Sequence, residues 1–258
     1  MILKGISKNS LFTLIDLSDA YFSIPVNEND MKYLKFIWDG RLYAFQCLPF
    51  GLASAPRVFT KIMKVIFSYV RSMGISSFFY IDDSLLQAEN FASAVSNTRR
   101  VKNFIESLGF DINVEKSVLY PTHRIMFLGY IIDSVLFKVF LPEDKIQKIL
   151  DLSFYILKQE KVQIRYLTQL IGLYSSAHYA TLWAHLFHRY VDIDRSLALC
   201  RENNNFNHYT NLSENGKSEI QWWLDNIKRV NGKPIRFDDP TYYLDTDASN
   251  HGWGAVLD

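Results

Sequence analysis

The sequence has few cysteines and almost no net charge. Cys47 and Cys200, among 258 residues, are too few for a disulfide framework or a four-cysteine zinc site. We therefore expect a reducing compartment. The 28 Lys and Arg residues nearly balance the 27 Asp and Glu residues, which leaves a formal net charge of +1. The global charge therefore indicates no polyanionic partner, and any such function must rest on a local site.

A signal-peptide pattern and an uninterrupted membrane span are also lacking. The first ten residues, MILKGISKNS, contain no apolar core and no small-residue cleavage site. The segment from Tyr166 to Phe187 has no Asp, Glu, Lys or Arg, but Gln169 and His178 would be unfavourable in lipid. We expect this segment to be a buried helical hairpin, and the protein to act inside the cell, in the cytoplasm or the nucleus.

Apolar and aromatic residues are abundant. Hydrophobic residues make up 48% of the chain and aromatic residues 15%. Disordered chains are poor in aromatics and carry high net charge, so this composition excludes disorder. It predicts a well-packed body that contains a sheet, formed as one large domain or two small ones.

The first 140 residues are predicted to alternate strands and helices in a recognisable order. The pattern indicates a strand, a helix, a hairpin, a second helix that begins at Asn90, and further strands; their ranges are 11–17, 56–73, 76–88, 90–109, 110–120 and 124–132. This order predicts a ferredoxin-like split βαβ sheet with helices on one face, in the α+β class. Asp39-Gly40 predicts an additional hairpin.

Three carboxylates are predicted to meet at one edge of this sheet. Asp16 ends the first strand, and Asp82-Asp83 occupy the hairpin turn. A helical crossover makes the first strand and the first hairpin arm parallel, so their carboxyl ends share an edge. An isolated Asp-Asp turn is more often structural, and Asp16 alone can simply face water. Together the three need a counter-charge, for which magnesium is suited; two such ions serve phosphoryl transfer.

Beyond Pro142 the pattern becomes helical. Helices are predicted over 145–158, 166–190 and 219–229, with an Asn-rich loop over 200–210. A new apolar strand, TYYLDTD, begins at Thr241, and we expect the chain to end before its second strand. Because a lone strand is unstable, we interpret this end as the truncated start of another domain.

Five segments in order resemble the motifs of reverse transcriptases. They are similar to motif A, motif B, the YxDD box, motif D and motif E (the primer grip), respectively: FTLIDLSDAYFSIPV, LPFGLASAPRVF, YIDD, SLGFDINVEKS and FLGYI. The resemblance implies a polymerase palm with partial fingers over residues 1–140, because the chain begins shortly before Asp16 and lacks the family's N-terminal fingers.

The remaining chain extends this resemblance. IRYLTQLIGLYSSA and EIQWWLDNI are similar to the thumb and connection of retrotransposon enzymes, which implies a mostly helical thumb and connection over 141–237. YLDTDASNHGWGAVL resembles the first strand of their RNase H domain, which implies a truncated RNase H start over 238–258. This C-terminal segment resembles that of the tyrosine-recombinase, DIRS-type, retrotransposons most closely.

The resemblance implies a metal site. Asp16, Asp82 and Asp83 match the family's catalytic magnesium ligands, and the carbonyl of Leu17 adds an oxygen. Two Mg²⁺ ions are implied, with Mn²⁺ as a possible substitute.

A deoxynucleotide site is implied beside the metal site. Ala20 and Tyr21 match motif A, where an aromatic ring under the sugar excludes a 2′-hydroxyl; Phe50 and Gly51 lie beside the incoming base. Phe50 stands where retroviral enzymes have Gln. Lys116 matches the motif D lysine that protonates pyrophosphate. Without the motifs, Tyr21 reads as a core aromatic and Lys116 as a surface lysine.

Several other residues allow more than one interpretation. Phe127, Leu128, Gly129 and Tyr130 match the primer grip, although FLG also fits a buried strand. Asp247 matches the first RNase H carboxylate, whose partners are not in this sequence, so we expect no nuclease. His185 and His188 have the spacing of a metal pair, but packing is the better interpretation. Of Trp222 and Trp223, which can stack on bases, we expect one in the core.

The resemblance implies an RNA-directed DNA polymerase that uses deoxynucleoside triphosphates and an RNA/DNA primer-template, as part of a longer polyprotein and without a membrane. Two alternatives remain open. One is an inactive relic that only binds primer-template, because the fingers and a basic excess are lacking. The other is a generic RNA-binding or ligand-binding domain on the same sheet.

Overall fold

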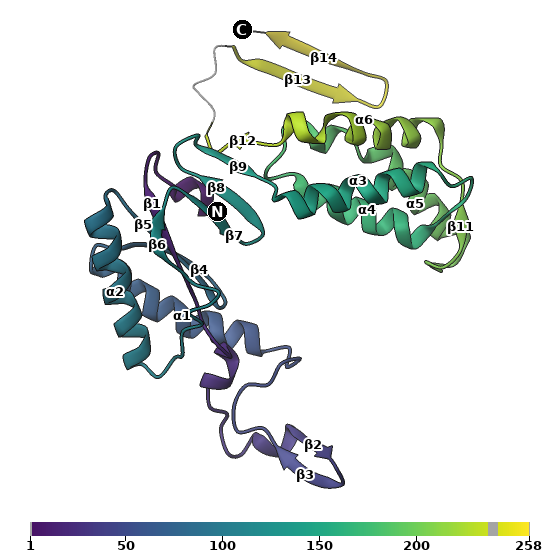
Figure 1. Cartoon of the computed structure of the whole chain (residues 1–258). Coiled ribbons are helices and arrows are strands. Elements are labelled where there is room, and N and C mark those ends of the chain that lie inside the picture. The colour runs from purple at the N-terminus through teal and green to yellow at the C-terminus, as the bar shows by residue number, and fades with distance from the viewer. Residues whose placement is uncertain (1, 237–241, 258) are drawn as a thin grey trace.

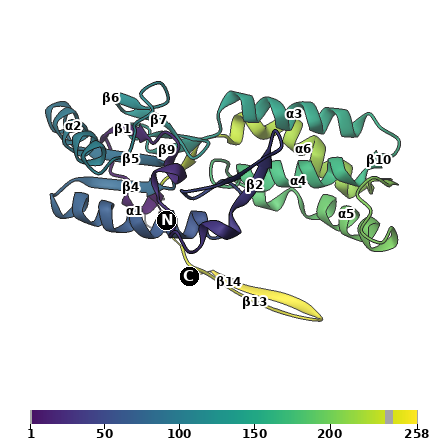
Figure 2. The same cartoon turned by 90° about the horizontal axis from the view of Figure 1, so that it is seen from below.

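The computed structural model describes residues 2–236 and 242–257. Figure 1 shows two main bodies: an α/β unit, formed by residues 2–140, and a helical unit of four helices further along the chain. Figure 2 shows the helical unit beside the α/β unit. Among the described residues, no helix is long and apolar enough to cross a membrane.

The α/β unit is built on a four-stranded sheet. Its strands lie in the order β4-β5-β1-β6, and each neighbouring pair is antiparallel. Their bounds are β1 Leu11–Asp16, β4 Ser76–Tyr80, β5 Asp83–Ala88 and β6 Val118–Thr122. β1 and β4 therefore run in the same direction with β5 between them. This is the predicted ferredoxin-like order, and the prediction is confirmed.

Two helices cover one face of this sheet, as predicted. They are α1, Ala55–Ser72, and α2, Phe91–Ser107. Ile15 and Leu86 point from the sheet into a core with Phe59, Phe67 and Val101 of the helices. The side chain of Asn90 accepts a hydrogen bond from the backbone N–H of Ser93 and caps α2, so the predicted start of this helix is also confirmed.

A second sheet covers the opposite face. Its order is β12-β9-β8-β7, with bounds β7 Arg124–Phe127, β8 Tyr130–Asp133, β9 Lys138–Phe140 and β12 Lys233–Pro234. Phe12, Leu14 and Leu85 of the first sheet pack against Ile125 and Ile132 of the second. The single strand predicted over 124–132 is wrong: Leu128 and Gly129 have φ angles of 49° and 75°, which turn the chain into a hairpin.

The helical unit is held together by buried aromatic and aliphatic side chains. Its elements are α3 Glu143–Leu157, β10 Val162–Gln163, α4 Ile164–Ala177, α5 Arg189–Arg201, β11 Tyr209–Thr210 and α6 Glu214–Val230. Tyr174 of α4 stacks on Trp223 of α6 with ring centroids 4.1 Å apart. This unit is mostly helical, as predicted.

The helix predicted over 166–190 is wrong in its second half. Helix α4 ends at Ala177, and α5 begins only at Arg189. Between them, the N–H of Leu182 donates to the carbonyl of Val230, and the N–H of Gly232 donates to the carbonyl of Ala180. The backbone here is paired with the end of α6, so it is not available to continue a helix.

Two hairpins and four short helices complete the described structure. In β2 (Lys35–Trp38) and β3 (Arg41–Ala44), the turn Asp39-Gly40 has φ angles of 48° and 70°, so the predicted hairpin is confirmed. The short 3₁₀ helices are η1 Ile2–Gly5, η2 Ala20–Ser23, η3 Met31–Tyr33 and η4 Ala184–Leu186.

The second hairpin corrects the expectation of a lone strand near the C-terminus. β13 (Leu244–Ser249) pairs along its length with β14 (Gly252–Leu257), and both strands are exposed throughout. The domain boundary predicted between residues 237 and 238, and the predicted strand start at 241, lie outside the described residues.

Candidate active site

The three predicted carboxylates converge at one edge of the first sheet. Asp16 is the last residue of β1 and lies directly opposite Asp83, the first residue of β5. Asp82 precedes it in the loop between β4 and β5, and its carbonyl accepts a hydrogen bond from the N–H of Leu17 (3.2 Å). The predicted convergence of the three residues is therefore confirmed, and the split βαβ topology is its cause.

The loop that carries Asp82 is short and strained. Tyr80 pairs with Asp83, so only Ile81 and Asp82 connect the two strands. Ile81 has a φ angle of 54°, in the left-handed region that β-branched residues rarely adopt. Such a conformation costs on the order of 1–3 kcal/mol and persists only where the surrounding structure holds it. Here the strand pairs on both sides hold it beside the carboxylates.

Burial, followed by crowding of negative charge, raises the pKa values of Asp16 and Asp83 at this edge. Burial, the nearby Asp82 and Asp16, and a hydrogen bond with Asp16 raise the pKa of Asp83 from 3.8 to about 6. Burial and Asp82 also raise the pKa of Asp16, while the positive charge of Lys116 acts in the opposite direction. The negative charge at this edge thus outweighs the effect of Lys116 on both carboxylates.

A loop from the end of the α/β unit fixes the end of β1. The N–H of Asp16 donates to the hydroxyl of Ser117 (3.0 Å), and its carbonyl accepts from the N–H of Asn113 (2.9 Å). The N–H of Ser18 donates to the carbonyl of Asp111 (2.9 Å). The strand predicted over 110–120 is therefore wrong in its first half, because these residues form a loop that reaches the site and carries Lys116 to it.

A pocket of about 280 Å³ opens beside Asp82. The pocket brings together most of the residues matched to the deoxynucleotide site. Its lining residues are Leu17, Ser18, Asp19, Ala20, Tyr21, Phe50, Ile81, Asp82, Asn113 and Lys116. Gly51 does not line this pocket; it forms a turn with a φ angle of 86° next to Phe50. Asp16 and Asp83 do not line this pocket.

Tyr21 lies between the core and the pocket. Its ring packs edge-on against Phe59 of the core (5.4 Å) and tilts against Phe50 (5.6 Å). It also lines the pocket, where burial and the negative charge of Asp82 raise its pKa. The core contacts hold the ring in place while one side of it remains available to a ligand.

Sequence analysis missed four residues of this pocket. Ser18 and Asp19 form a turn after β1, and Asp19 adopts a left-handed φ of 45°. Ile81 and Asn113 also line the pocket. The turn signal at Ser18-Asp19 was visible in the sequence, but nothing local to Asn113 indicated that its loop returns to β1.

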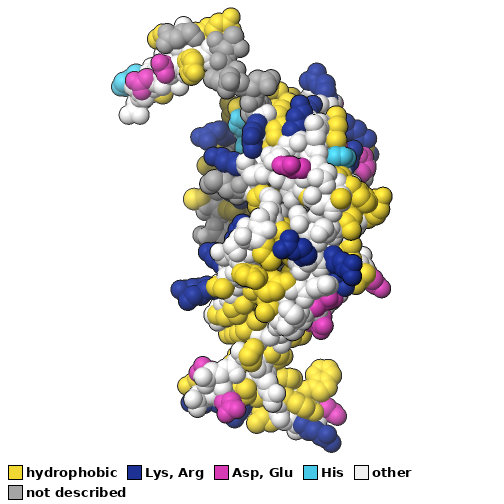
Figure 3. All heavy atoms as spheres, turned by 90° about the vertical axis from the view of Figure 1, so that its left-hand side faces the viewer, with side chains coloured by type: hydrophobic (Ala, Val, Ile, Leu, Met, Phe, Trp, Pro, Cys, Tyr) yellow, Lys and Arg dark blue, Asp and Glu magenta, His cyan; other side chains and the backbone are white. Residues whose placement is uncertain are grey.

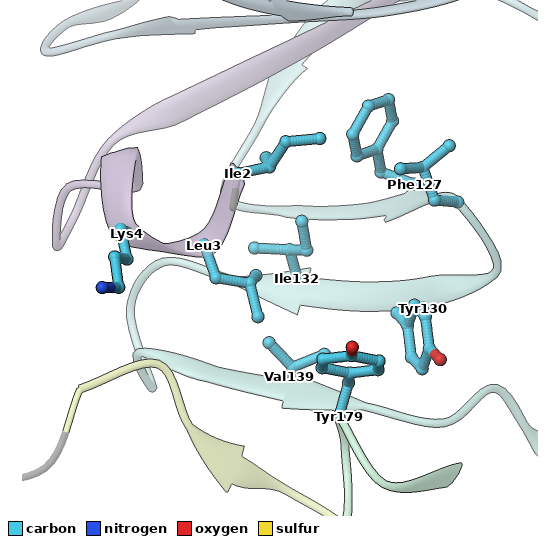
Figure 4. Close-up of a pocket in the computed structure, with 9 residues that line it drawn as sticks. Ile2, Leu3, Lys4, Phe127, Tyr130, Ile132, Val139 and Tyr179 are labelled. Carbon is cyan, nitrogen blue, oxygen red and sulfur yellow. The ribbon is translucent and has the colours of Figure 1, made fainter. Parts of the chain in front are cut away.

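The residues matched to the primer grip lie at a different pocket. Phe127, Leu128 and Tyr130, at the β7–β8 turn, line a largely apolar cavity of about 360 Å³ together with Leu3 and Tyr179 (Figure 4). The hydroxyl of Tyr130 donates to the carbonyl of Ser176 at 2.5 Å, so this turn is tied to α4 of the helical unit. The structure does not bring these residues into the carboxylate pocket.

The remaining candidates are dispersed. Asp247 is exposed on β13, opposite Gly254, and its carboxylate accepts a hydrogen bond from the N–H of Ala248. Trp223 is fully buried, as expected for one of the two tryptophans, while Trp222 stacks on Phe187 at 3.8 Å. His185 packs against the ring of His178 at 5.2 Å.

The donor chemistry at the carboxylate edge fits a hard divalent cation. Asp16, Asp82 and Asp83 offer only oxygen atoms, and their excess negative charge is what such an ion neutralises. Within residues 2–236 and 242–257, however, no three His, Cys, Asp or Glu side chains form a ready-made metal-binding arrangement. The carboxylates thus meet as neighbours at the sheet edge without enclosing a site.

Among the relatives that match the chain in sequence, two cover different shares of it. It is 24% identical over 268 residues to the "Retrovirus-related Pol polyprotein from transposon opus" of Drosophila melanogaster, which covers 99% of this chain and 24% of the polyprotein. It is also 31% identical over 126 residues to "Protein P" of duck hepatitis B virus (strain China), which covers 48% of this chain and 16% of that protein. The chain therefore spans about a quarter or less of the length of these relatives.

Solved structures match the fold over the whole chain. The foamy viral protease-reverse transcriptase in complex with an RNA/DNA hybrid matches with a TM-score of 0.71 and 16% identity, over 100% of this chain and 35% of that one. A second structure of that protein, in complex with double-stranded DNA, matches with a TM-score of 0.74 and 17% identity, over 99% and 44%. The fold is that of a palm-and-thumb polymerase.

A family model supplies the assignment. The model described as "Reverse transcriptase (RNA-dependent DNA polymerase)" matches residues 2–132, which include the whole carboxylate edge and its pocket. The sequence motifs, the order of the strands and the positions of Asp16, Asp82 and Asp83 agree with this match. This chain belongs to the reverse transcriptase family.

Proposed function

We propose that this chain is the polymerase core of a retrotransposon reverse transcriptase, which extends a DNA primer on an RNA or DNA template with deoxynucleoside triphosphates. The observation that carries the proposal is the convergence of three carboxylates beside a pocket that also holds Tyr21 and Lys116. The relative from transposon opus supports the retrotransposon assignment. The DIRS-type group is our finer proposal, and it rests on the TDAS and GWGA segments.

Asp16, Asp82, Asp83 and the carbonyl of Leu17 would hold two magnesium ions, for which manganese can substitute. When bound, these ions supply the positive charge that the triphosphate and the carboxylates require, and they favour ionisation of the primer 3′-hydroxyl. The strand pair between Asp16 and Asp83 fixes the spacing of two of the donors, and the two-residue loop sets the third beside them.

The reaction joins the primer 3′-oxygen to the α-phosphorus of the nucleotide, breaks the bond to the β-phosphate oxygen and releases pyrophosphate. Lys116 lies in the pocket wall with its charge close enough to influence Asp16 and Asp83. In our proposal it neutralises the triphosphate and donates a proton to the leaving pyrophosphate.

Tyr21 and Phe50 select and orient the nucleotide in this proposal. The Tyr21 ring is braced by Phe59, so it cannot easily move aside for a 2′-hydroxyl. Phe50 is largely exposed at the rim, where its ring can pack against the base. Ala20 and the Gly51 turn leave space for the sugar and the backbone around them.

The remaining assignments concern the arrangement around this site. We propose that residues 1–140 are the palm with partial fingers, 141–237 the thumb and connection, and 238–258 the start of an RNase H domain that contains Asp247. The β7–β8 turn, Phe127 to Tyr130, positions the primer end. We place the activity within a longer polyprotein, inside the cell, in the cytoplasm or the nucleus.

Single-nucleotide incorporation on an RNA template with a DNA primer tests the proposal. We expect extension that requires magnesium and falls at least about 1,000-fold in Asp82→Asn, because the substitution removes one carboxylate charge. Asp225→Asn, at an exposed acid on α6, is the matched control and should extend at the original rate. Equal activity in Asp82→Asn would refute the proposed chemistry. A folded chain that binds primer-template without extending it would favour a binding module.

A further inference from the structure

The β2–β3 hairpin lies apart from the two main bodies of the molecule (Figure 1). Its strands pair with each other, and every residue in both is exposed. Within residues 2–236 and 242–257, neither strand joins another sheet. Figure 3 shows the hairpin at the lower end of the molecule, where apolar side chains lie among charged ones. Exposed apolar side chains that gather in this way commonly serve a function outside the core.

The two faces of this hairpin differ. Phe36 and Tyr43 lie directly opposite each other, and their rings stack with centroids 5.6 Å apart. The adjacent pair, Ile37 and Leu42, lies on the other face, because side chains alternate along a strand. Both members of that pair are largely exposed. One face therefore carries an aromatic pair, and the other an aliphatic pair.

The aromatic face continues as a row of rings toward the active site. The ring of Phe36 lies 4.9 Å from that of Phe45. Phe45 stacks on Phe22 at 6.4 Å, and Phe22 packs edge-on against Phe50 at 5.1 Å. Such separations are typical of interacting aromatic pairs. We call these four residues the aromatic row; it begins on the hairpin and ends in the wall of the carboxylate pocket.

Backbone hydrogen bonds hold the base of the hairpin together. The N–H of Val26 donates to the carbonyl of Gln46 (2.9 Å), and the N–H of Phe45 donates to the carbonyl of Leu34 (3.1 Å). These bonds tie the segment that carries Phe45 to the segment that follows Phe22. The middle of the aromatic row therefore rests on paired backbone.

Phe50, at the other end of the row, needs support from its neighbours. Its side chain is 65% exposed at the rim of the pocket, and its ring contacts those of Tyr21 and Phe22. Phe22 is itself 40% exposed, so its orientation depends in turn on Phe45. A side chain that is already held in its bound orientation loses less entropy when the ligand arrives, which increases affinity.

We propose that Phe22, Phe45 and Phe36 are positioning residues, which hold Phe50 in the orientation that packs against the base of the incoming nucleotide. The inference rests on the proposed polymerase function and adds to it a role for the hairpin. None of the three residues lines the pocket, so their effect on the nucleotide passes through Phe50. The hairpin thus increases the affinity for the nucleotide from outside the pocket.

Steady-state single-nucleotide incorporation, at saturating magnesium and primer-template, tests the inference. We expect Phe22→Leu to raise the KM for the deoxynucleotide about two- to tenfold, because an unsupported Phe50 must be ordered when the nucleotide binds. The kcat should change less than about twofold, because the carboxylates are untouched. Phe36→Leu should also raise the KM, by a smaller factor, whereas Phe36→Tyr keeps the ring and should restore the original KM.

A double variant distinguishes one connected row from independent effects. If Phe36 acts through Phe22, the KM of Phe22→Leu, Phe36→Leu should equal that of Phe22→Leu alone. Increases in KM that multiply in the double variant would overturn the inference, as would a fall in kcat without a rise in KM.

The matched control removes the aliphatic pair from the opposite face of the hairpin. Ile37→Ala, Leu42→Ala keeps the aromatic row and should leave both KM and kcat unchanged. An equal rise in KM in this control would mean that the hairpin acts only through its fold, and the inference would be wrong. Thermal unfolding checks each variant; because the substituted side chains are partly exposed, we expect midpoints close to that of the original chain.

The experiment also separates this inference from the proposed function. An active original chain whose KM is unchanged by Phe22→Leu overturns the inference alone. If the original chain shows no magnesium-dependent extension, the proposed polymerase function fails, and the inference fails with it.

Discussion

The carboxylate edge and the core of the helical unit differ in how well their buried polar groups are paired. At the edge, Asp16 and Asp83 face each other with raised pKa values, and Ile81 is held in a left-handed conformation. The next residue, Ser84, is fully buried, and its hydroxyl has no hydrogen-bond partner within residues 2–236 and 242–257. Each of these features reduces the stability of the fold.

Around Trp223 in the helical unit the buried polar groups are satisfied, although Arg195 Nε on α5 is buried without a hydrogen-bond partner among the described residues. The carboxylate of Glu219 accepts from the N–H of Val191 at the start of α5, and the indole N–H of Trp223 donates to the carbonyl of Phe187. The hydroxyls of Ser153 and Tyr174 bond to each other at 2.9 Å. We infer that the helical unit is organised for stability, whereas the carboxylate edge gives up stability to hold its charges together.

The largest expected effect on stability comes from a substitution in the core of the helical unit. Trp223→Ala removes a fully buried ring that stacks on Tyr174 and leaves a cavity, so we expect a loss of about 3–5 kcal/mol in the free energy of unfolding. Chemical denaturation measures it. Trp222→Ala, at the half-buried neighbour that stacks on Phe187, should cost clearly less. A loss from Trp223→Ala below about 1 kcal/mol would mean that the core of the helical unit is not organised for stability as we infer.

Asp83→Asn, at the carboxylate edge, should instead increase the free energy of unfolding. The folded pKa of Asp83 is about 6 against an ordinary 3.8, so its contribution favours folding below about pH 4 and is lost as the pH rises through 6. Removing the charge should therefore stabilise the protein at pH 8 by about 1 kcal/mol, after allowance for solvent screening of this half-buried group. The gain should shrink toward pH 4.

Thermal unfolding at pH 4 and pH 8, without divalent cations, measures this effect. Asp225→Asn on α6 is the control and should show no such pH-dependent gain. A lower midpoint for Asp83→Asn at pH 8 would mean that the carboxylate edge is not a site of charge repulsion.

Ser84→Ala should give the smallest effect. The hydroxyl of Ser84 is buried without a partner, so its removal should raise the free energy of unfolding by about 0.5–1 kcal/mol. Ser153→Ala, which leaves the Tyr174 hydroxyl without its partner, is the matched control and should be destabilising. If both substitutions shift the denaturation midpoint in the same direction, the two regions do not differ as we describe.

Local signals and chain topology were sufficient to predict the carboxylate edge. Asp16 and Asp82-Asp83 each lie at the end of an apolar run, and the rule that governs crossover connections brings those ends together. The Asp39-Gly40 turn was predictable because its left-handed conformation is encoded in the two residues themselves. The Tyr21 pocket position followed from the resemblance rather than from the residue alone.

The features that were missed depend on contacts distant in sequence. The break between α4 and α5 arises because residues 180–182 bond to residues 230–232, and no local residue indicates that pairing. The loop at Asp111–Ser117 reads as a strand, yet it forms hydrogen bonds to the end of β1. The second C-terminal strand contains two glycines, Gly252 and Gly254, which weaken its strand signal.

The central position of β1 has a consequence for how the protein folds. β1 is the first strand of the main sheet along the chain. Its partner β5 follows only after α1, and its partner β6 only after α2. Until β5 has been synthesised, β1 has no neighbour on either side, and until β6 has been synthesised one of its edges stays unpaired. Such an unpaired edge is prone to aggregate. Pairings between distant segments also form slowly. We therefore expect the catalytic edge to be assembled late, once residues 118–122 have left the ribosome.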